Sequence, residues 1–463
     1  MDLSLTFNAE LIRRYDKAGP RYTSYPTAVQ FHDGFGEKQY RKWAQYSNQH
    51  PPGQPLSLYF HLPFCATVCY YCACNKIITK NRARAIPYLE HLHREIAMQG
   101  ELFDKERKVE QLHWGGGTPT FINHAQMREL MRVTGEHFNL RDDDQGEYSI
   151  EVDPREADAD TIRLLREIGF NRLSMGVQDF DPAVQQAVNR NQSEEETVAV
   201  LEAARQQGFK SVSMDLIYGL PHQSVASFAR TLDKVIAAAP DRLSVFNYAH
   251  LPAMFKTQRQ MNEADMPAPA VKLGILQHTI EQLGDAGYVY IGMDHFARPD
   301  DELALAQHSR TLYRNFQGYS THADCDLVAM GSTSISKVGQ SYSQNVKDLE
   351  GYYSRIDNAG LPVFRGVELD ADDLLRREVI TQLMCHFTLD IPALETDHAI
   401  KFSQYFDVEQ VELQKMQDDG LLLHDDSQVT VLPAGRLLVR NICMVFDRYL
   451  RNTQGTRQFS RVI

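Results

Sequence analysis

The feature that most constrains the fold is a regular alternation that begins near residue 56. Short apolar or β-branched runs, expected to be strands, lie at 56–62, 109–114, 148–152, 172–175, 212–217 and 242–248. Amphipathic stretches, expected to be helices, lie between them near 84–103, 124–138, 159–168, 194–207 and 224–238. Such alternation is typical of βαβ units and a parallel sheet. Six repeats favour a partial or complete (β/α) barrel, with an open doubly wound sheet as the alternative.

The flanking regions differ from this central pattern. We expect 1–55 to be an extended arm and linker, because the segment GPRYTSYPT starting at Gly19 contains two prolines that disfavour a helix. The barrel domain is expected over 56–369, including a further helix near 270–286 and a strand at 288–293. Residues 370–463 predict a mainly helical C-terminal domain, with helices at 372–385, 408–417 and 433–446. A small hairpin at 421–424 and 428–431 gives this domain a shape similar to a winged helix.

Composition excludes several classes of function. The 463 residues include 48 basic and 61 acidic ones, giving a formal net charge of −13, which argues against a broad nucleic-acid surface. Acidic residues also outnumber basic ones within 370–463, which weakens a DNA-binding interpretation of the winged-helix shape. No apolar run approaches the roughly 18 residues of a membrane span, and the first residues do not resemble a secretion signal. We therefore expect a cytoplasmic, monomeric protein, and a local basic pocket for an anionic substrate stays possible.

Four of the seven cysteines fall within ten residues: Cys65, Cys69, Cys72 and Cys74. An odd number of cysteines and no recognisable signal peptide argue against a disulfide framework. The remaining three, at positions 325, 385 and 443, are most simply small buried hydrophobic residues.

The spacing C-x3-C-x2-C of Cys65, Cys69 and Cys72 directly follows the first expected strand. Three thiolates on one loop suit an iron–sulfur cluster whose fourth iron has no protein ligand. Structural zinc usually requires four ligands, and Cys74 would be a strained fourth one. The pattern favours a cluster and leaves zinc, or a chance spacing, as alternatives.

Two further motifs lie where strands are expected to end. The run WGGGTP at 114–119 follows the second strand, and its glycines permit either close backbone approach to a ligand or a plain turn. Glu151 and Asp153 end the third strand. Glu151 is either a ligand-binding carboxylate or one used for capping or an ion pair.

The cysteine spacing, with an aromatic residue just before the third cysteine, resembles the signature of radical S-adenosylmethionine (SAM) enzymes. This resemblance implies a [4Fe-4S] cluster on a loop after the first strand of a full or partial (β/α) barrel. It further implies that the open iron binds SAM, which is cleaved reductively to methionine and a 5′-deoxyadenosyl radical. The glycine run and Glu151 would then contact SAM.

A closer resemblance is to the oxygen-independent coproporphyrinogen III oxidases. It depends on GPRYTSYPT, on Cys74-Asn75-Lys76, on SVFNYAH at 244–250 and on the stretch 459–463. The resemblance implies two SAM molecules, the first bound by the cluster together with Tyr59, Gly116, Glu151 and Ile335. The second would lie near Tyr71, Gly117, Thr118, Gln178, Arg190, Asp215 and Ala249. Phenylalanine is common in that family at position 71, and Tyr71 here keeps the ring.

The implied reaction is oxidative decarboxylation of two propionates of coproporphyrinogen III, in haem biosynthesis, with an unidentified electron donor and acceptor. Arg21, Tyr22 and Tyr25 are candidate substrate contacts, with packing on the barrel as the alternative, and Arg461 has less support. Cys74 is a candidate catalytic residue, whereas His61 is expected to be a core histidine. Two other classes stay open, a haem-binding chaperone, whose members typically lack both the arm and the Cys74 extension, and a zinc-stabilised scaffold.

Overall fold

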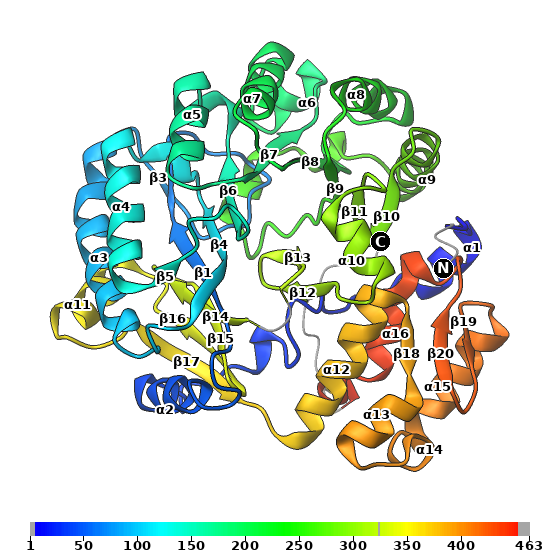
Figure 1. Ribbon diagram of the computed structural model, residues 1–463. Coiled ribbons are helices and arrows are strands. Elements are labelled where there is room, and N and C mark those ends of the chain that lie inside the picture. Colours follow the sequence, from blue (N-terminus) through cyan, green and yellow to red (C-terminus); the bar gives the residue numbers. More distant parts are fainter. Residues whose placement is uncertain (1–4, 323–324, 452–463) are drawn as a thin grey trace.

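The computed structural model describes residues 5–322 and 325–451, and its centre is one strongly curved sheet (Figure 1). The parallel strands lie in the order β9-β8-β7-β6-β4-β1-β14. Their bounds are β1 (Leu56–Leu62), β4 (Lys108–Gly116), β6 (Glu147–Val152), β7 (Arg172–Gln178), β8 (Ser211–Tyr218), β9 (Arg242–Asn247) and β14 (Asp326–Met330). The six strands expected from the sequence are all present.

The order of the strands separates the two expected topologies. From β1 to β9 each new parallel strand is added on the same side, as in a barrel, whereas a doubly wound sheet reverses direction. Antiparallel strands extend both ends, namely β10 (Val289–Gly292) and β11 (His295–Ala297) beside β9, and β15 (Ile335–Val338), β16 (Ser341–Asn345) and β17 (Val363–Glu368) beyond β14. Within the described ranges no pairing joins β10 to β17. The partial barrel is therefore confirmed.

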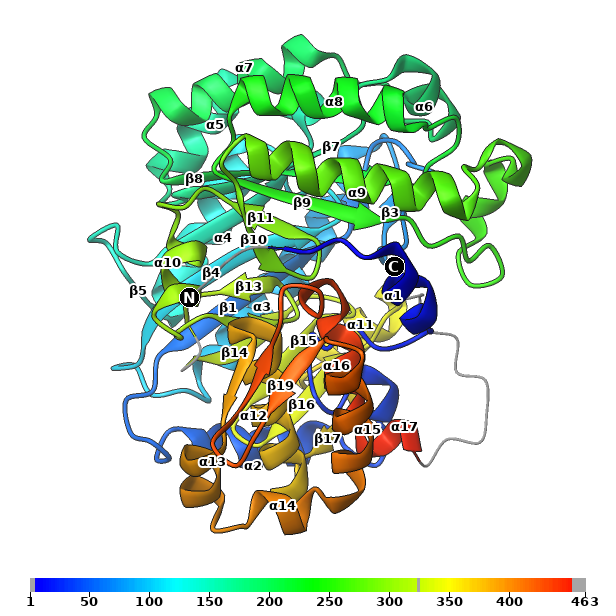
Figure 2. The same cartoon turned by 90° about the vertical axis from the view of Figure 1, so that its right-hand side faces the viewer.

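Helices surround the outside of the sheet (Figures 1 and 2). They are α3 (Ala85–Gly100), α4 (His124–His137), α5 (Ala159–Glu167), α6 (Pro182–Ala187), α7 (Glu194–Gln206), α8 (Val225–Ala238), α9 (Pro269–Asp285) and α11 (Leu349–Asp357). A further helix, α10 (Glu302–His308), packs on β10 and on the C-terminal region. Capping boxes at Asn123, Ser193 and Ser224 begin three of them, because each side chain accepts a hydrogen bond from an amide of the first turn. The caps agree with the helix starts expected near 124, 194 and 224, whereas α6, α10 and α11 were not predicted from the sequence.

Short strands complete the barrel domain. A hairpin of β12 (Tyr313–Asn315) and β13 (Gly318–Ser320) lies inside the ring of strands (Figure 1). The pair β2 (Phe64–Cys65) and β3 (Ile77–Ile78) flanks the cysteine loop, and β5 (Asn139–Leu140) extends beside β4.

The N-terminal region differs from the expectation of an extended arm. GPRYTSYPT is free of helix and strand, but α1 (Ala9–Tyr15) and α2 (Glu37–Ser47) flank it. In α2 the buried residues Tyr40, Trp43, Ala44 and Ser47 recur at helical spacing, a signal that the prolines and the linker composition obscured.

The C-terminal region packs below the barrel in the view of Figure 2. Its helices are α12 (Ala371–His386), α13 (Ile391–His398), α14 (Phe402–Tyr405), α15 (Asp407–Asp418), α16 (Val439–Val445) and α17 (Arg448–Arg451). The expected hairpin of β19 (Leu422–His424) and β20 (Gln428–Val431) has a third strand, β18 (Thr388–Asp390), which was too short to predict. Among the described helices, none is long and apolar enough to span a bilayer.

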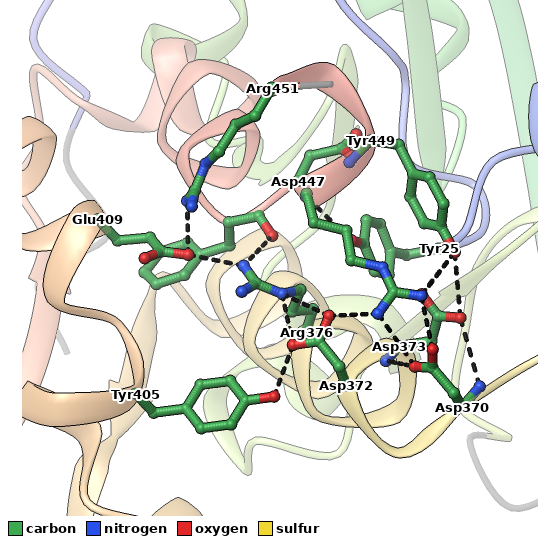
Figure 3. A network of polar contacts seen from close by, with 12 residues as sticks. Tyr25, Asp370, Asp372, Asp373, Arg376, Tyr405, Glu409, Asp447, Tyr449 and Arg451 are labelled. Carbon is green, nitrogen blue, oxygen red and sulfur yellow. Dashed lines mark hydrogen bonds and ion pairs between the residues drawn. The ribbon is translucent and has the colours of Figure 1, made fainter. Parts of the chain in front are cut away.

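A network of ion pairs joins the arm to this region (Figure 3). The Arg448 guanidinium lies 2.6 Å from Asp372, and the Arg448 amide donates to the Tyr25 hydroxyl at 3.2 Å. Arg376 pairs at 2.7 Å with Glu409, whose side chain is 1% exposed. Because these charges are compensated, the network fixes the arm against α12 and α17.

Candidate active site

A cavity of about 250 Å³ lies at the carboxyl ends of the parallel strands, where barrels of this kind carry their active sites. Its walls come from the cysteine loop and from the ends of β4, β6, β7 and β8. It is lined by Cys65, Ala66, Thr67, Cys69, Tyr71, Cys72, Cys74, Lys76, Gly116, Gly117, Thr118, Glu151, Val152, Asp153, Arg155, Glu156, Ser174, Gly176, Gln178, Arg190 and Asp215. Most of the site residues expected from the sequence therefore lie together, although they span 150 positions of the chain.

The cysteine loop is closed by backbone hydrogen bonds. The Ile77 amide donates to the Pro63 carbonyl at 2.7 Å, and the Thr79 amide donates to the Cys65 carbonyl at 2.9 Å. Lys76 donates from Nζ to the Cys72 carbonyl at 2.8 Å. These bonds hold the sulfur-bearing segment as a compact loop over the strand ends.

The cysteine sulfurs differ in their surroundings, and those of Cys69 suit an anionic thiolate, whereas burial raises the pKa of the Cys65 thiol to about 11. Cys69 Sγ lies 3.6 Å from Arg190 Nη1 and 3.8 Å from Arg155 Nη2. Thr118 Oγ1 donates to Cys65 Sγ at 3.6 Å. Positive charge and hydrogen-bond donors beside sulfur favour metal-bound thiolates.

The number of donors distinguishes a cluster from a zinc ion. A structural zinc ion normally takes four protein ligands, whereas each cysteine of a cubane cluster binds its own iron. Cys65, Cys69 and Cys72 supply three thiolates on one short loop, which suits a [4Fe-4S] cluster whose fourth iron has no protein ligand.

The glycine run is packed directly against the cysteine loop. Gly116 has a φ of +114°, and a Cβ there would lie 2.5 Å from His61 Nδ1. A Cβ on Gly117 would lie 2.7 Å from the Phe64 carbonyl oxygen. The Gly117 amide donates to the Leu62 carbonyl at 2.8 Å. The run is thus required for close approach of two loops and is more than a plain turn.

Glu151 is held in one position by two donors. The Gly116 amide donates to Oε2 at 3.0 Å, and His113 Nε2 lies 3.5 Å from Oε1. Desolvation raises the pKa of Glu151, but the His113 contact and the Gly116 amide outweigh it and hold the pKa below its usual value. The Tyr59 ring stacks on His113 with centroids 5.8 Å apart, so Tyr59 supports the carboxylate from behind. Glu151 is therefore an anionic acceptor facing the cavity.

Arg190 is buried, with 7% of its surface exposed, rather than part of a surface ion pair. Its Nη2 donates to the Gly176 carbonyl at 2.6 Å, and its Nη1 lies 3.1 Å from Asp153 Oδ2. Asp215, on the same wall, accepts from Ser174 Oγ at 3.2 Å, and burial raises its pKa to about 6. This wall of the cavity thus contains one permanent cation, Arg190, and one carboxyl group, Asp215, that can be protonated near neutral pH.

Sequence reasoning missed Arg155 as a site residue, and it named Asp153 at the end of the third strand without giving it a role. The two side chains pair at 2.7 Å, and Arg155 also reaches Cys69. The sequence feature that could have identified both residues is their position directly after β6, the strand that carries Glu151. 

Three expected contacts are not among the cavity-lining residues. Tyr59 lies behind His113, and Ile335 packs with the buried cluster that contains Phe31. The Ala249 carbonyl accepts from Gln258 Nε2 at 3.3 Å, and the same amide nitrogen donates to the Tyr71 carbonyl at 3.1 Å. Ala249 is therefore connected to the cavity through Tyr71.

Of the three candidate substrate contacts in the arm, only Arg21 lies beside residues of the barrel interior. Arg21 pairs with Asp294 and lies 5.8 Å over the Phe246 ring. Tyr22 and Tyr25 are only 5% and 1% exposed, and the Tyr22 hydroxyl donates to an aspartate of the C-terminal region. This placement favours packing for both tyrosines, because their rings and hydroxyls are already occupied.

Three other expectations have simple outcomes. Arg461 and the stretch 459–463 lie outside the described residues. His61 is a core histidine as expected, since Nε2 donates to the Asn75 carbonyl at 3.1 Å and Nδ1 accepts from the Tyr59 hydroxyl at 3.1 Å. Cys74 lines the cavity and is exposed, which is compatible with a role there but assigns none.

Comparison with known proteins defines the class first. The model of the radical SAM superfamily matches residues 59–235, which contain the cysteine loop and most of the cavity, and membership of that superfamily implies a [4Fe-4S] cluster and SAM. A second model, the HemN C-terminal domain, matches residues 369–438.

Full-length relatives then define the particular family. The chain is 55% identical to the oxygen-independent coproporphyrinogen III oxidase of Pseudomonas aeruginosa and 51% identical to that of Escherichia coli, with 99% of each chain covered. A solved structure of coproporphyrinogen III oxidase (HemN) from Escherichia coli matches with a TM-score of 0.92 at 49% identity. This match covers 96% of this chain and 100% of that one. The chain therefore belongs to the oxygen-independent coproporphyrinogen III oxidases, radical SAM enzymes of haem biosynthesis. The resemblance predicted from the motifs is confirmed.

Proposed function

We propose that this chain converts two propionate side chains of coproporphyrinogen III to vinyl groups, giving protoporphyrinogen IX. Each propionate loses carbon dioxide, one hydrogen atom and one electron. The observation that carries the proposal is the single cavity in which three cysteine sulfurs meet the polar ends of β4, β6 and β8. When bound there, the cluster and SAM supply the 5′-deoxyadenosyl radical that removes the hydrogen atom from the propionate β-carbon, a step beyond any side-chain base.

The residues around the cavity are suited to hold these groups. Cys65, Cys69 and Cys72 would bind the cluster. Glu151, kept anionic by His113 and the Gly116 amide, is suited to accept hydrogen bonds from ribose hydroxyls. We assign the first SAM to Tyr59, Gly116, Glu151 and Ile335.

We assign a second SAM to the opposite wall, near Tyr71, Gly117, Thr118, Gln178, Arg190, Asp215 and Ala249. Arg190 supports this assignment because its Nε is buried without a hydrogen-bond partner, so its guanidinium can still receive an acceptor. The fork of an arginine side chain matches a carboxylate such as that of methionine. Asp215 faces the same space with a carboxylate suited to an ammonium or hydroxyl group.

The chain's other contributions are orientation and exclusion of water. Arg21 is the residue of the arm that we propose to contact a propionate, whereas Tyr22 and Tyr25 hold the arm in place. Cys74, beside the cluster residues, is proposed to assist the radical step and not to bind iron.

We further propose a division into an arm and linker over 1–55, a barrel domain over 56–369 and a C-terminal domain over 370–463. The enzyme would act as a cytoplasmic monomer. It would receive electrons from a reducing donor and pass one electron per propionate to a separate acceptor.

The test is anaerobic turnover of cluster-reconstituted protein with SAM, a reductant, an electron acceptor and coproporphyrinogen III. Protoporphyrinogen and 5′-deoxyadenosine should appear together and be lost in Cys65→Ser. Cys385→Ala removes a buried thiol elsewhere and should keep both products. An intact cluster that gives no decarboxylated product, in protein that binds haem tightly, would contradict the proposal and favour a haem-binding chaperone.

A further inference from the structure

The interior of the barrel holds a second cavity, of about 310 Å³, that adjoins the proposed active site. The two cavities share Glu151, Ser174 and Asp215 as wall residues. A group that enters the second cavity therefore lies next to the position proposed for the second SAM. The established family assignment does not say which residues of this chain meet the substrate there.

One wall of this second cavity is aromatic. Phe246 and His295 pack edge to face with ring centroids 5.7 Å apart, and His295 and Tyr319 do the same at 5.3 Å. All three side chains line the cavity. His295 Nδ1 donates to the Met293 carbonyl at 2.7 Å, and burial lowers its pKa to about 4, so the ring is neutral. The wall is thus an uncharged surface suited to pyrrole rings.

An arginine lies at each end of this wall. Arg21 is 5.8 Å over the Phe246 ring, and Arg314 is 4.7 Å over the Tyr319 ring. Arg314 and Tyr319 are direct cross-strand partners in the hairpin of β12 and β13 that lies inside the barrel (Figure 1). The hairpin therefore places one cation directly against the Tyr319 ring of the cavity wall.

Arg314 is a buried cation without a counter-charge. It is 8% exposed, and its Nε and Nη1 atoms have no hydrogen-bond partner. In the described part of the chain no carboxylate forms an ion pair with it. Two other arginines, Arg172 and Arg242, line this cavity and are compensated, since Arg172 pairs with Glu302 and Arg242 pairs at 2.9 Å with Asp301. Arg314 lies beside the cavity wall, against the Tyr319 ring. A buried guanidinium with an aromatic ring but no anion beside it is costly, and a carboxylate ligand would supply the missing charge.

The neighbourhood of Arg314 is positively charged. Arg21 and Arg440 lie close by, and Asp294 is the carboxylate that faces them. Burial lowers the pKa of Arg440 to about 10, and repulsion from Arg21 adds to this effect. Arg440 is used by the arm, because its Nε donates to the Pro20 carbonyl at 2.7 Å. Of the three arginines, Arg314 is the one whose Nε and Nη1 have no acceptor among the described residues.

We propose that Arg314 binds a substrate propionate at the far end of the wall formed by Phe246, His295 and Tyr319, with pyrrole rings packed on that wall. This inference rests on the proposed function, because it takes a porphyrinogen with several carboxylates as the ligand. Arg314 is a binding residue and takes no part in bond breaking. It holds the macrocycle so that another propionate faces the active-site cavity.

The experiment measures binding of coproporphyrin III, the stable oxidised form of the substrate, by fluorescence titration of anaerobic holoprotein. Arg314→Gln should weaken binding roughly ten- to hundredfold, the value of one charge-assisted contact, and Arg314→Lys should recover part of the loss. Arg298→Gln is the matched control, because it removes an exposed arginine and should leave binding unchanged. The tetramethyl ester of coproporphyrin III, which has no carboxylates, should bind wild type and Arg314→Gln alike.

A second readout separates binding from a structural role. Removing an uncompensated buried cation should leave the melting temperature of the ligand-free protein unchanged or raise it. Unchanged coproporphyrin binding in Arg314→Gln, or a variant that unfolds, would overturn the assignment. A wild-type protein that neither binds coproporphyrin III nor decarboxylates the substrate would instead contradict the proposed function itself.

Discussion

Glu95 makes the stability of this protein depend on pH in a direction opposite to that of most carboxylates. The residue lies on α3 with no exposed surface. It accepts hydrogen bonds from the Tyr352 hydroxyl at 2.6 Å, the Asn345 amide group at 2.7 Å and the Gly331 amide at 2.8 Å. Burial raises its pKa from 4.5 to about 7 in spite of these three donors. The protonated form is therefore favoured by folding.

The direction in which the free energy of unfolding changes with pH follows from proton linkage. Between the unfolded pKa of 4.5 and the folded pKa of about 7, the folded state binds more protons than the unfolded state. The free energy of unfolding therefore falls as pH rises through this window, by about 1.4 kcal/mol per pH unit. The stabilisation is complete below the unfolded pKa and lost above the folded one, a total of about 3 kcal/mol.

Glu95→Gln removes this titration, so the substitution changes the free energy of unfolding through residue 95 only by an amount that does not depend on pH. Urea denaturation of both proteins from about pH 5 to 8 should show that wild type loses about 3 kcal/mol relative to the variant. Glu90→Gln, an exposed change on the same helix, should give a profile parallel to wild type. Parallel profiles for wild type and Glu95→Gln would refute the reasoning.

Three further predictions concern the cavity and the network in Figure 3. Because the pKa of Asp215 is about 6, SAM binding measured by calorimetry should weaken as pH falls through that value in wild type. It should be flat in Asp215→Asn, and equal pH profiles would contradict this role. Gly117→Ala places a Cβ 2.7 Å from a carbonyl of the cysteine loop and should lower the iron content, whereas Gly284→Ala meets no atom within 4 Å and should not. Arg376→Met leaves the buried Glu409 short of a partner and should cost about 3 kcal/mol in urea denaturation. An unchanged urea midpoint would show that the remaining contacts of Glu409 suffice.

Local patterns predicted the elements that position the site. The strand at 56–62 was correct to the residue, since a short, mostly apolar run that is buried almost throughout is a local property. The helices with capping boxes were found for the same reason. Cys65, Cys69 and Cys72 lie within eight residues, so their spacing favoured a cluster, and its resemblance to the radical SAM signature indicated the chemistry before any fold was known.

Contacts between distant segments could not be predicted from local sequence patterns. Arg155 and Arg190 reach Cys69 across 86 and 121 positions. Tyr22 and Tyr25 carry the same aromatic character whether they face a substrate or a core, and only their burial favours packing.

The sequence by itself determined the parallel βαβ arrangement and favoured cluster chemistry, because the cysteine spacing and the alternation of strands and helices are local patterns. The strand order, which separates a barrel from a doubly wound sheet, came from the tertiary structure. The tertiary structure decided which charges are paired. Arg172, Arg242 and Arg314 are alike in the sequence, but folding places a carboxylate beside the first two and an aromatic ring beside the third. Pairing depends on distances through space between segments that sequence periodicity does not relate.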